Sequence, residues 1–262
     1  MIPKIIHYCW LSHNQDPIPP KFQQYIDGWH QLLPDYEFIK WDFTRFDKDS
    51  SVWVSEAFDN KKYAFAADYI RLYAVYNYGG IYMDTDVELL KPFDELLDKP
   101  YMFAYENPNK NWIESGCFGA EKGNEFIKKC LDYYEGRHFV KSNGTLDSLP
   151  IPIIMGSVIR DNNLDLNIYP WNYFTAKTIK TGIETPDETT YAIHHFAESW
   201  KSEEEQKIRN NARKIRNSIP FIGEPIAFLY DQGCKSFHIL KTEGFNELIN
   251  RIKQFFVCKL KM

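Results

Sequence analysis

Apolar and polar residues follow two different spacings along this chain. Apolar side chains that recur every three or four positions predict amphipathic helices at residues 21–33, 63–78 and 123–134. Short apolar or alternating runs predict strands at residues 4–10, 36–41, 81–83, 99–105, 117–120 and 191–196. The strand, helix and strand at the start of the chain favour an α/β fold with parallel strands.

The predicted helix at residues 63–78 leads into the most informative stretch of the sequence. It ends at Gly79-Gly80, which fits a left-handed C-terminal cap, and the short strand 81–83 then runs into Asp84-Thr85-Asp86. No proline- or glycine-rich linker divides the sequence. We therefore predict one α/β core over residues 1–200 and a helical appendage over residues 201–262, which begins with a highly charged helix or loop at 201–217.

The composition is that of a folded globular protein. Of 262 residues, 44% are hydrophobic and 26% are charged, which excludes a disordered, collagen-like or coiled-coil chain. The net charge of −5 provides no positive field, so we expect no nucleic-acid partner. The aromatic fraction of 16% suits stacking on sugars or bases, although aromatic side chains fill protein cores more often.

Neither the cysteines nor the apolar runs point to secretion or to a membrane span. The five cysteines form no C-x-x-C pair, which argues against a zinc ribbon and favours reduced thiols. The first apolar run, KIIHYCWL, is too short for a signal peptide, and no run approaches the roughly 20 residues of a membrane span. We expect a cytoplasmic protein, at most peripheral on the cytoplasmic face of the membrane.

Residues 246–262 mix basic and apolar side chains. The basic ones are Arg251, Lys253, Lys259 and Lys261. The pattern is more typical of a C-terminal helix packed on the core, with an amphipathic helix on an anionic membrane as the alternative.

Asp84 and Asp86 are the first candidates for chemistry. They stand two positions apart after an apolar strand, so on an extended chain both carboxylates point the same way. The end of a strand is also where α/β sheets place their ligands. Such hard oxygen ligands suit Mn²⁺ or Mg²⁺. Taken alone, the pair is more typical of a solvated turn.

The surrounding sequence resembles a known enzyme family over most of residues 1–200. Three segments carry the resemblance: IPKIIH through Trp10-Leu11, the block from Ala64 to YGGIYMDTDV, and YAIH ending at Ser199-Trp200. They are similar to the D-x-D glycosyltransferases of the family 32 group. This group includes capsular polysaccharide enzymes, yeast Golgi mannosyltransferases and α-1,4-galactosyltransferases, and its core looks like that of the large clostridial glucosylating toxins.

The resemblance implies a GT-A type fold, in which a single Rossmann-like domain with a central mixed sheet binds a nucleotide sugar. It implies that Asp86 binds a divalent cation, that Asp84 reaches the cation or the donor ribose, and that Tyr82 lines the nucleotide pocket. Asp68 and Arg71 lie three apart on a helix and therefore on one face. In similar transferases the matching pair holds the donor sugar and phosphate, whereas the alternative is an intrahelical ion pair. The residues expected to act in catalysis are Asp68, Arg71, Asp84 and Asp86.

Further residues are expected around the nucleotide. The resemblance implies that Trp10 stacks on the base, with core packing as the alternative, and that Ser199, Trp200 and Lys201 contact the diphosphate. Lys201 is equally typical of a solvated helix.

His194 is expected to complete the shell of Mn²⁺ (or Mg²⁺). The alternative is that His194 and His195 are hydrogen-bonded strand histidines, since only one of two adjacent residues can face the site. His7 is expected to be structural. Glu114 stands where relatives often carry Asn, and it either contacts the acceptor or is exposed.

These expectations define one leading function. It is a metal-dependent, retaining glycosyltransferase that moves a hexose from UDP-hexose, or from GDP-mannose, to a hydroxyl of a glycan or lipid-linked oligosaccharide. The expected setting is bacterial capsule, exopolysaccharide or lipopolysaccharide synthesis. The alternatives are transfer to a protein side chain and a carbohydrate- or nucleotide-binding module without turnover.

Overall fold

The computed structural model describes residues 1–197, 203–218 and 223–242. The chain divides into two units: residues 1–179 with 183–200, and residues 180–182 with 201–262. In the described part, Cys9, Cys117, Cys130 and Cys234 are free thiols.

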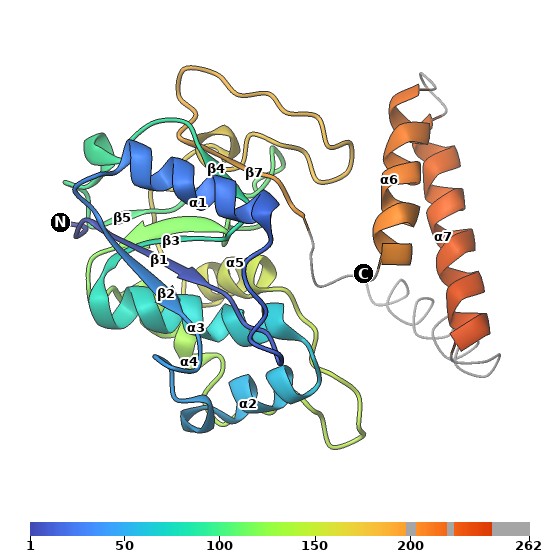
Figure 1. The fold of residues 1–262 in the computed structure, drawn as a ribbon, viewed down its shortest axis with the longest axis horizontal. Helices are drawn as coiled ribbons and strands as arrows, with labels where there is room; N and C mark the ends of the chain where they lie inside the picture. Colours follow the sequence, from blue (N-terminus) through green and yellow to red (C-terminus); the bar gives the residue numbers. More distant parts are fainter. Residues whose placement is uncertain (198–202, 219–222, 243–262) are drawn as a thin grey trace. The chain divides into compact units, whose positions relative to one another are not determined.

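A five-stranded mixed sheet organises the first unit (Figure 1). Its order is β2 (Glu37–Trp41), β1 (Ile5–Cys9), β3 (Gly80–Met83), β6 (Cys117–Ala120) and β5 (Tyr101–Met102). Strand β1 runs parallel to β2 and β3, whereas β6 runs antiparallel to β3 and β5. A separate antiparallel pair joins β4 (Val87–Leu89) to β7 (Ala192–His194). The prediction of an α/β fold with a central mixed sheet is confirmed.

Helices cover both faces of this sheet, and a hydrophobic core lies on each (Figure 1). Helix α1 (Pro20–Leu32) packs on one face, and the other carries α2 (Val52–Asp59), α3 (Tyr63–Tyr78), α4 (Glu125–Asp132) and α5 (Ile151–Asp161). Alternation along β3 sends Ile81 and Met83 into the α1 core and Tyr82 into the α3 core. The end of β3 is therefore held from both sides.

The tight junction between α3 and β3 depends on two glycines with positive φ. Gly79 has φ of 69° and Gly80 has φ of 104°. A Cβ on Gly80 would lie 2.6 Å from the carbonyl oxygen of Ile5 on the neighbouring strand. Only glycine allows this approach, which brings the start of β3 into register beside β1.

Most elements of the core lie where the sequence predicts them. The helix at 63–78 and the strand at 117–120 match α3 and β6 residue for residue. The strand predicted at 99–105 is shorter, because pairing with β6 covers only Tyr101–Met102. Helices α2 and α5 and strand β4 were not predicted, whereas α7 lies within the predicted helical appendage. Strand β4 has three residues, too few for an alternating pattern.

The second unit is described by two helices. These are α6 (Glu203–Ser218) and α7 (Gly223–Thr242), which pack against each other and are joined by a hydrogen bond from the Asn211 amide to the Tyr230 hydroxyl. Ala212 in α6 and Ala227 in α7 are buried. The predicted charged helix or loop at 201–217 is thus a helix over its described part. The predicted basic segment 246–262 lies outside the described residues. Of the helices that are described, none is both long enough and apolar enough to cross a membrane.

His7 is buried in β1 and makes two hydrogen bonds. Its Nε2 lies 2.8 Å from the carbonyl oxygen of Gly79, and the indole N–H of Trp41 donates to its Nδ1 at 3.1 Å. The neutral ring satisfies both contacts, with Nε2 as donor and Nδ1 as acceptor. Burial lowers the pKa of His7 to about 4.

This depressed pKa predicts a pH effect on stability. The unfolded chain takes up a proton at His7 below about pH 6.5, and the folded protein does so only near pH 4, so the stabilising contribution of this site is lost as pH falls through that window. Between pH 7 and pH 5, wild type should lose about 2 kcal/mol more of its free energy of unfolding than His7→Gln. Urea unfolding of both proteins at the two pH values measures this difference. An identical pH dependence would contradict it.

Candidate metal centre

The two D-x-D carboxylates stand at the edge of the sheet where the parallel strands end. The Asp84 N–H donates to the carbonyl oxygen of Gly116 at 2.7 Å, and the Val87 N–H donates to the carbonyl oxygen of Asp84 at 3.0 Å. These bonds form a short turn between β3 and β4. The backbone on both sides of Asp84 and Asp86 is therefore fixed by sheet pairing.

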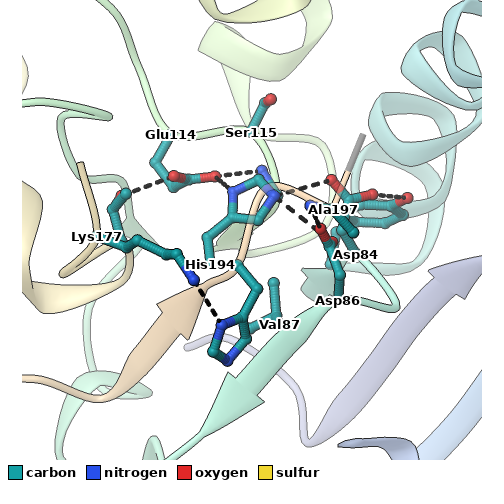
Figure 2. A network of polar contacts seen from close by, with 12 residues as sticks. Asp84, Asp86, Val87, Glu114, Ser115, Lys177, His194 and Ala197 are labelled. Atoms are coloured by element: carbon teal, nitrogen blue, oxygen red, sulfur yellow. Dashed lines mark hydrogen bonds and ion pairs between the residues drawn. The ribbon is translucent and has the colours of Figure 1, made fainter. Parts of the chain in front are cut away.

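His194 reaches the same point from the far end of the sequence. It ends β7, where it pairs with Val87 in β4. Its Nε2 lies 3.6 Å from Oδ1 of Asp86 and 4.0 Å from Oδ2 of Asp84. The three side chains offer ligand atoms that all lie within 4.8 Å of one another. Figure 2 shows the imidazole facing both aspartates.

This donor set fits a divalent cation. Two ligands that each bind one cation at about 2.1 Å are separated by about 3 to 4 Å, the range found between His194 Nε2 and the two carboxylates. Two oxygens and one imidazole nitrogen suit Mn²⁺ or Mg²⁺ and leave coordination positions for water or phosphate oxygens. The described residues therefore form a plausible three-ligand site that no single segment of the sequence contains.

The other nitrogen of His194 is held by a buried carboxylate. Nδ1 lies 3.0 Å from Oε1 of Glu114, whose side chain is fully buried. Glu114 also accepts hydrogen bonds from the Gly116 N–H at 2.5 Å and the Thr175 hydroxyl at 2.6 Å. The ring of Phe196 stacks on His194 with 4.0 Å between centroids. The expectation that Glu114 is exposed is wrong, because the β6 side of the sheet and Thr175 enclose it.

Opposite charges set the protonation of this cluster. Burial alone would lower the pKa of His194, but Glu114 and Asp86 raise it well above its ordinary value. Burial likewise acts to raise the pKa of Asp86, and the neighbouring His194 brings it down to about 2. The low pKa keeps Asp86 ionised at neutral pH, so its negative charge attracts a cation to this point.

Arg71 organises the opposite side of Asp84. Its Nη1 donates to Asp84 at 3.1 Å and to the carbonyl oxygen of Ser115 at 2.8 Å, while Nη2 pairs with Asp68 at 3.1 Å. The Tyr82 hydroxyl donates to the other oxygen of Asp84 at 2.9 Å. Asp68 and Arg71 are buried, so their pairing is not a solvated surface contact. Burial raises the pKa of Asp68 to about 7 despite the charge of Arg71.

The structure thus brings together Asp68, Arg71, Tyr82, Asp84, Asp86 and His194. Tyr82 is buried and contacts Asp84, so its predicted contact with a nucleotide stays a prediction. Trp10 follows β1 at the same edge of the sheet, with its indole N–H on the carbonyl oxygen of Asp16 and its ring 6.2 Å from Phe22. Ser199, Trp200 and Lys201 lie outside the described residues.

His195 points away from the aspartates. Its ring stacks on Tyr25 and bonds to Glu88 at 2.8 Å. Of the two adjacent histidines, His194 alone faces the D-x-D carboxylates, as the alternation of a strand requires.

Sequence reasoning missed two parts of this site. Thr175 supports Glu114 through its hydroxyl, and no motif marks it. Glu106 is a second buried carboxyl on the hairpin that carries Glu114. Burial and the nearby Glu114 raise the pKa of Glu106 to about 8. An acidic residue in the aromatic run YMFAYE was the only available signal.

Gly116 provides a test of the close packing around His194. An added Cβ would lie 2.5 Å from Cε1 and 2.7 Å from Nδ1 of His194, so Gly116→Ala must displace the ring. We expect a loss of Mn²⁺ affinity of about tenfold or more, since the ligand leaves its position. Titration of the protein with Mn²⁺ measures it.

The matched control is Gly28→Ala in α1, where an added Cβ meets no heavy atom within 4 Å. It should leave Mn²⁺ affinity unchanged and stabilise the fold by about 0.5–1 kcal/mol. Equal Mn²⁺ affinity in the two variants would contradict the assigned position of His194.

Comparison with known proteins now adds to this geometry. Residues 19–103 match the family model described as a glycosyltransferase sugar-binding region containing a DXD motif. This stretch is therefore similar to a glycosyltransferase sugar-binding region of the DXD type. It contains Asp68, Arg71, Asp84 and Asp86, whereas Glu114 and His194 lie beyond it. The resemblance seen in the sequence is confirmed.

Two yeast proteins are similar to the glycosyltransferase region and its surroundings. Inositol phosphoceramide mannosyltransferase 3 of Schizosaccharomyces pombe is 32% identical over 130 residues, which is 48% of this chain and 35% of that protein. Mannosyl phosphorylinositol ceramide synthase SUR1 of Saccharomyces cerevisiae is 32% identical over 164 residues, which is 60% of this chain and 39% of that protein. The chain therefore spans well under half the length of either relative.

A solved structure titled PaToxG glycosyltransferase is also similar. The match has 19% sequence identity and a TM-score of 0.45, and it covers 62% of this chain and 70% of that one. A likeness at this level carries no weight for function.

Proposed function

We propose that this protein is a metal-dependent glycosyltransferase that moves a hexose from a nucleotide sugar to a hydroxyl group. One observation carries the proposal: Asp84, Asp86 and His194 converge on one point, and the two aspartates are the D-x-D of a matched sugar-binding region. If Asp84 and Asp86 only formed a turn, nothing would require His194, which lies in the β4–β7 sheet, to face them.

The residues of the site would divide the work between the two halves of the donor. Asp84, Asp86 and His194 would hold Mn²⁺ or Mg²⁺, and a bound divalent cation offsets the negative charge that grows on the leaving nucleoside diphosphate. Arg71 and Asp68 would orient the donor sugar and phosphate. Trp10 and Tyr82 would contact the nucleoside, and Ser199, Trp200 and Lys201 the diphosphate.

The reaction would exchange one bond at the anomeric carbon for another. The bond from that carbon to the diphosphate oxygen breaks, and a bond to the acceptor oxygen forms. We propose that the new bond keeps the donor configuration, with the acceptor proton passing to the departing phosphate. Glu114 is unsuited to be a nucleophile, because it is fully buried and both its oxygens accept hydrogen bonds.

The names of the relatives narrow the substrates. Those proteins are mannosyltransferases of inositol phosphoceramide, so GDP-mannose and a lipid-linked acceptor become the first pair to test. UDP-hexoses, which the sequence favoured, stay in the panel. A role in bacterial polysaccharide synthesis, cytoplasmic location and peripheral contact with the membrane stay predictions.

The experiment measures nucleotide release by the purified protein from GDP-mannose, UDP-glucose, UDP-galactose and UDP-N-acetylglucosamine, with Mn²⁺ and with EDTA. Slow release from one donor in Mn²⁺ alone is the expected result, with water as the acceptor. If no donor is turned over and neither UDP nor GDP binds in Mn²⁺, the proposal fails. Nucleotide binding without any turnover, even after acceptor saccharides are added, would instead identify a binding module.

A further inference from the structure

The two ring nitrogens of His194 face two different groups of carboxylates. Nε2 points to Asp84 and Asp86, and Nδ1 points to Glu114 (Figure 2). Glu114 stands 80 residues away in the sequence and touches neither aspartate through any recorded bond within the described residues. Its side chain reaches the metal site through the imidazole and, less directly, through the backbone of Gly116, whose carbonyl oxygen accepts the Asp84 N–H.

We propose that Glu114 is a positioning residue, which accepts the Nδ1–H of His194 and thereby turns Nε2 toward Asp84 and Asp86 as a metal ligand. The inference rests on the proposed function, since it takes these three residues as the metal site. It adds a fourth residue, outside the matched sugar-binding region, on which the affinity for the cation depends.

Hydrogen-bond chemistry fixes the direction of this contact. An ionised carboxylate only accepts hydrogen bonds, so the nitrogen that faces Glu114 must carry a hydrogen. A cation that binds at the site would replace the hydrogen on the other nitrogen, Nε2, and use its lone pair.

Glu114 is itself held in place on every side. Oε1 accepts the Gly116 N–H as well as facing His194, and Oε2 accepts the Thr175 hydroxyl. Thr175 is fully buried, and its carbonyl oxygen accepts the His194 N–H at 3.1 Å. Thr175 therefore holds both the end of β7, which carries His194, and the Glu114 carboxylate, which orients the His194 ring.

This arrangement leaves Glu114 no role in binding substrate. Its side chain has no exposed surface, and both oxygens already have partners. Carboxylates that orient a metal-bound histidine change metal affinity by 10- to 100-fold when they are replaced. A residue that binds the acceptor sugar would leave metal affinity unchanged, so the two roles are separable by experiment.

Glu106 provides a matched control. The bridge between Tyr105 and Ile113 is antiparallel, so Glu106 and Glu114 lie on the same face of one hairpin. Glu106 is also buried, but among the residues that the structure describes its carboxyl has no hydrogen-bond or ion-pair partner. Because its pKa is raised to about 8, glutamine closely matches its protonated form.

The experiment titrates the full chain with Mn²⁺ and follows free Mn²⁺ by electron paramagnetic resonance. Glu114→Gln should weaken Mn²⁺ binding by about 10- to 100-fold, whereas Glu106→Gln should stay within about twofold of wild type. Melting temperatures in EDTA and in Mn²⁺ separate the roles further. If Glu114 has a purely structural role, Glu114→Gln should lower the melting temperatures in EDTA and in Mn²⁺ equally. If Glu114 positions His194, the substitution should also reduce the rise in melting temperature that Mn²⁺ causes.

Each other outcome overturns the inference. If Glu114→Gln binds Mn²⁺ like wild type while Asp86→Asn does not, the metal site stands and the role of Glu114 is refuted. Equal weakening in Glu114→Gln and Glu106→Gln would show a general effect of buried charge. Absence of Mn²⁺ binding in wild type would overturn the proposed function as well. Should Glu114→Gln not fold, Thr175→Val removes one support of Glu114, and unchanged affinity in that variant would refute the inference.

Discussion

Asp86→Asn is expected to lower Mn²⁺-dependent nucleotide release by about a thousandfold. A bound divalent cation contributes several kcal/mol to the charge that develops on the leaving group, and each 1.36 kcal/mol changes the rate tenfold. Asp86 lies nearer than Asp84 to Nε2 of His194, and among the described residues no arginine pairs with it, whereas Arg71 pairs with Asp84. Initial rates of release from the active donor, with saturating Mn²⁺, measure the loss.

Glu88→Gln is the matched control for this substitution. Glu88 continues the alternation of Asp84 and Asp86 by two residues, but it bonds to His195 instead of facing the metal site. Its rate should stay within about threefold of wild type, since it lies outside the ligand set. The assignment of Asp86 as a ligand would be refuted if Asp86→Asn kept a tenth or more of the activity.

Arg71→Met is expected to affect both stability and activity. Arg71 is buried and ties together three segments: α3 through Asp68, the turn after β3 through Asp84, and the strand leading into β6 through Ser115. Removing one partner of a buried ion pair costs about 3–5 kcal/mol, because the remaining charge is left unpaired. Nucleotide release should fall at least a hundredfold, since Asp84 loses the contact that orients it.

A second substitution separates these two effects. In Arg71→Met the Asp68 carboxyl loses its only cationic partner among the described residues, and Asp68→Asn replaces this buried titratable group with a neutral one. The double variant should therefore regain about 1–2 kcal/mol over Arg71→Met in urea unfolding, while its activity stays low. A double variant less stable than Arg71→Met would contradict the described pairing.

The centre of the site could be predicted because its residues lie close together in the sequence. Asp84 and Asp86 stand two apart behind an apolar strand, and the glycines before that strand mark the turn that places it. Helix α3 was predicted because its apolar stripe runs unbroken to those glycines. Local patterns of this kind depend on backbone geometry that the sequence itself encodes.

The surroundings of the site depend on contacts that no local pattern encodes. Glu114 was expected to contact the acceptor or to be exposed, because nothing near it in the sequence shows that Thr175 and His194 meet it in the core. His194 could be assigned only through resemblance, and the strand pairing of β4 with β7 explains why it is the one that faces the aspartates. For Glu106 the only signal was its place at the end of the run YMFAYE, which does not show burial, since burial of a lone carboxyl is a property of the fold.

The central claim is that Asp84, Asp86 and His194 form a cation site for a nucleotide sugar. Its most direct test is a calorimetric titration of the wild-type protein with GDP and with UDP, in Mn²⁺ and in EDTA. We predict that one of the two nucleotides binds in Mn²⁺, that EDTA abolishes the binding, and that His194→Gln weakens it by tenfold or more while His195→Gln does not. Binding of equal strength in EDTA, or equal affinities in the two histidine variants, would contradict the claim.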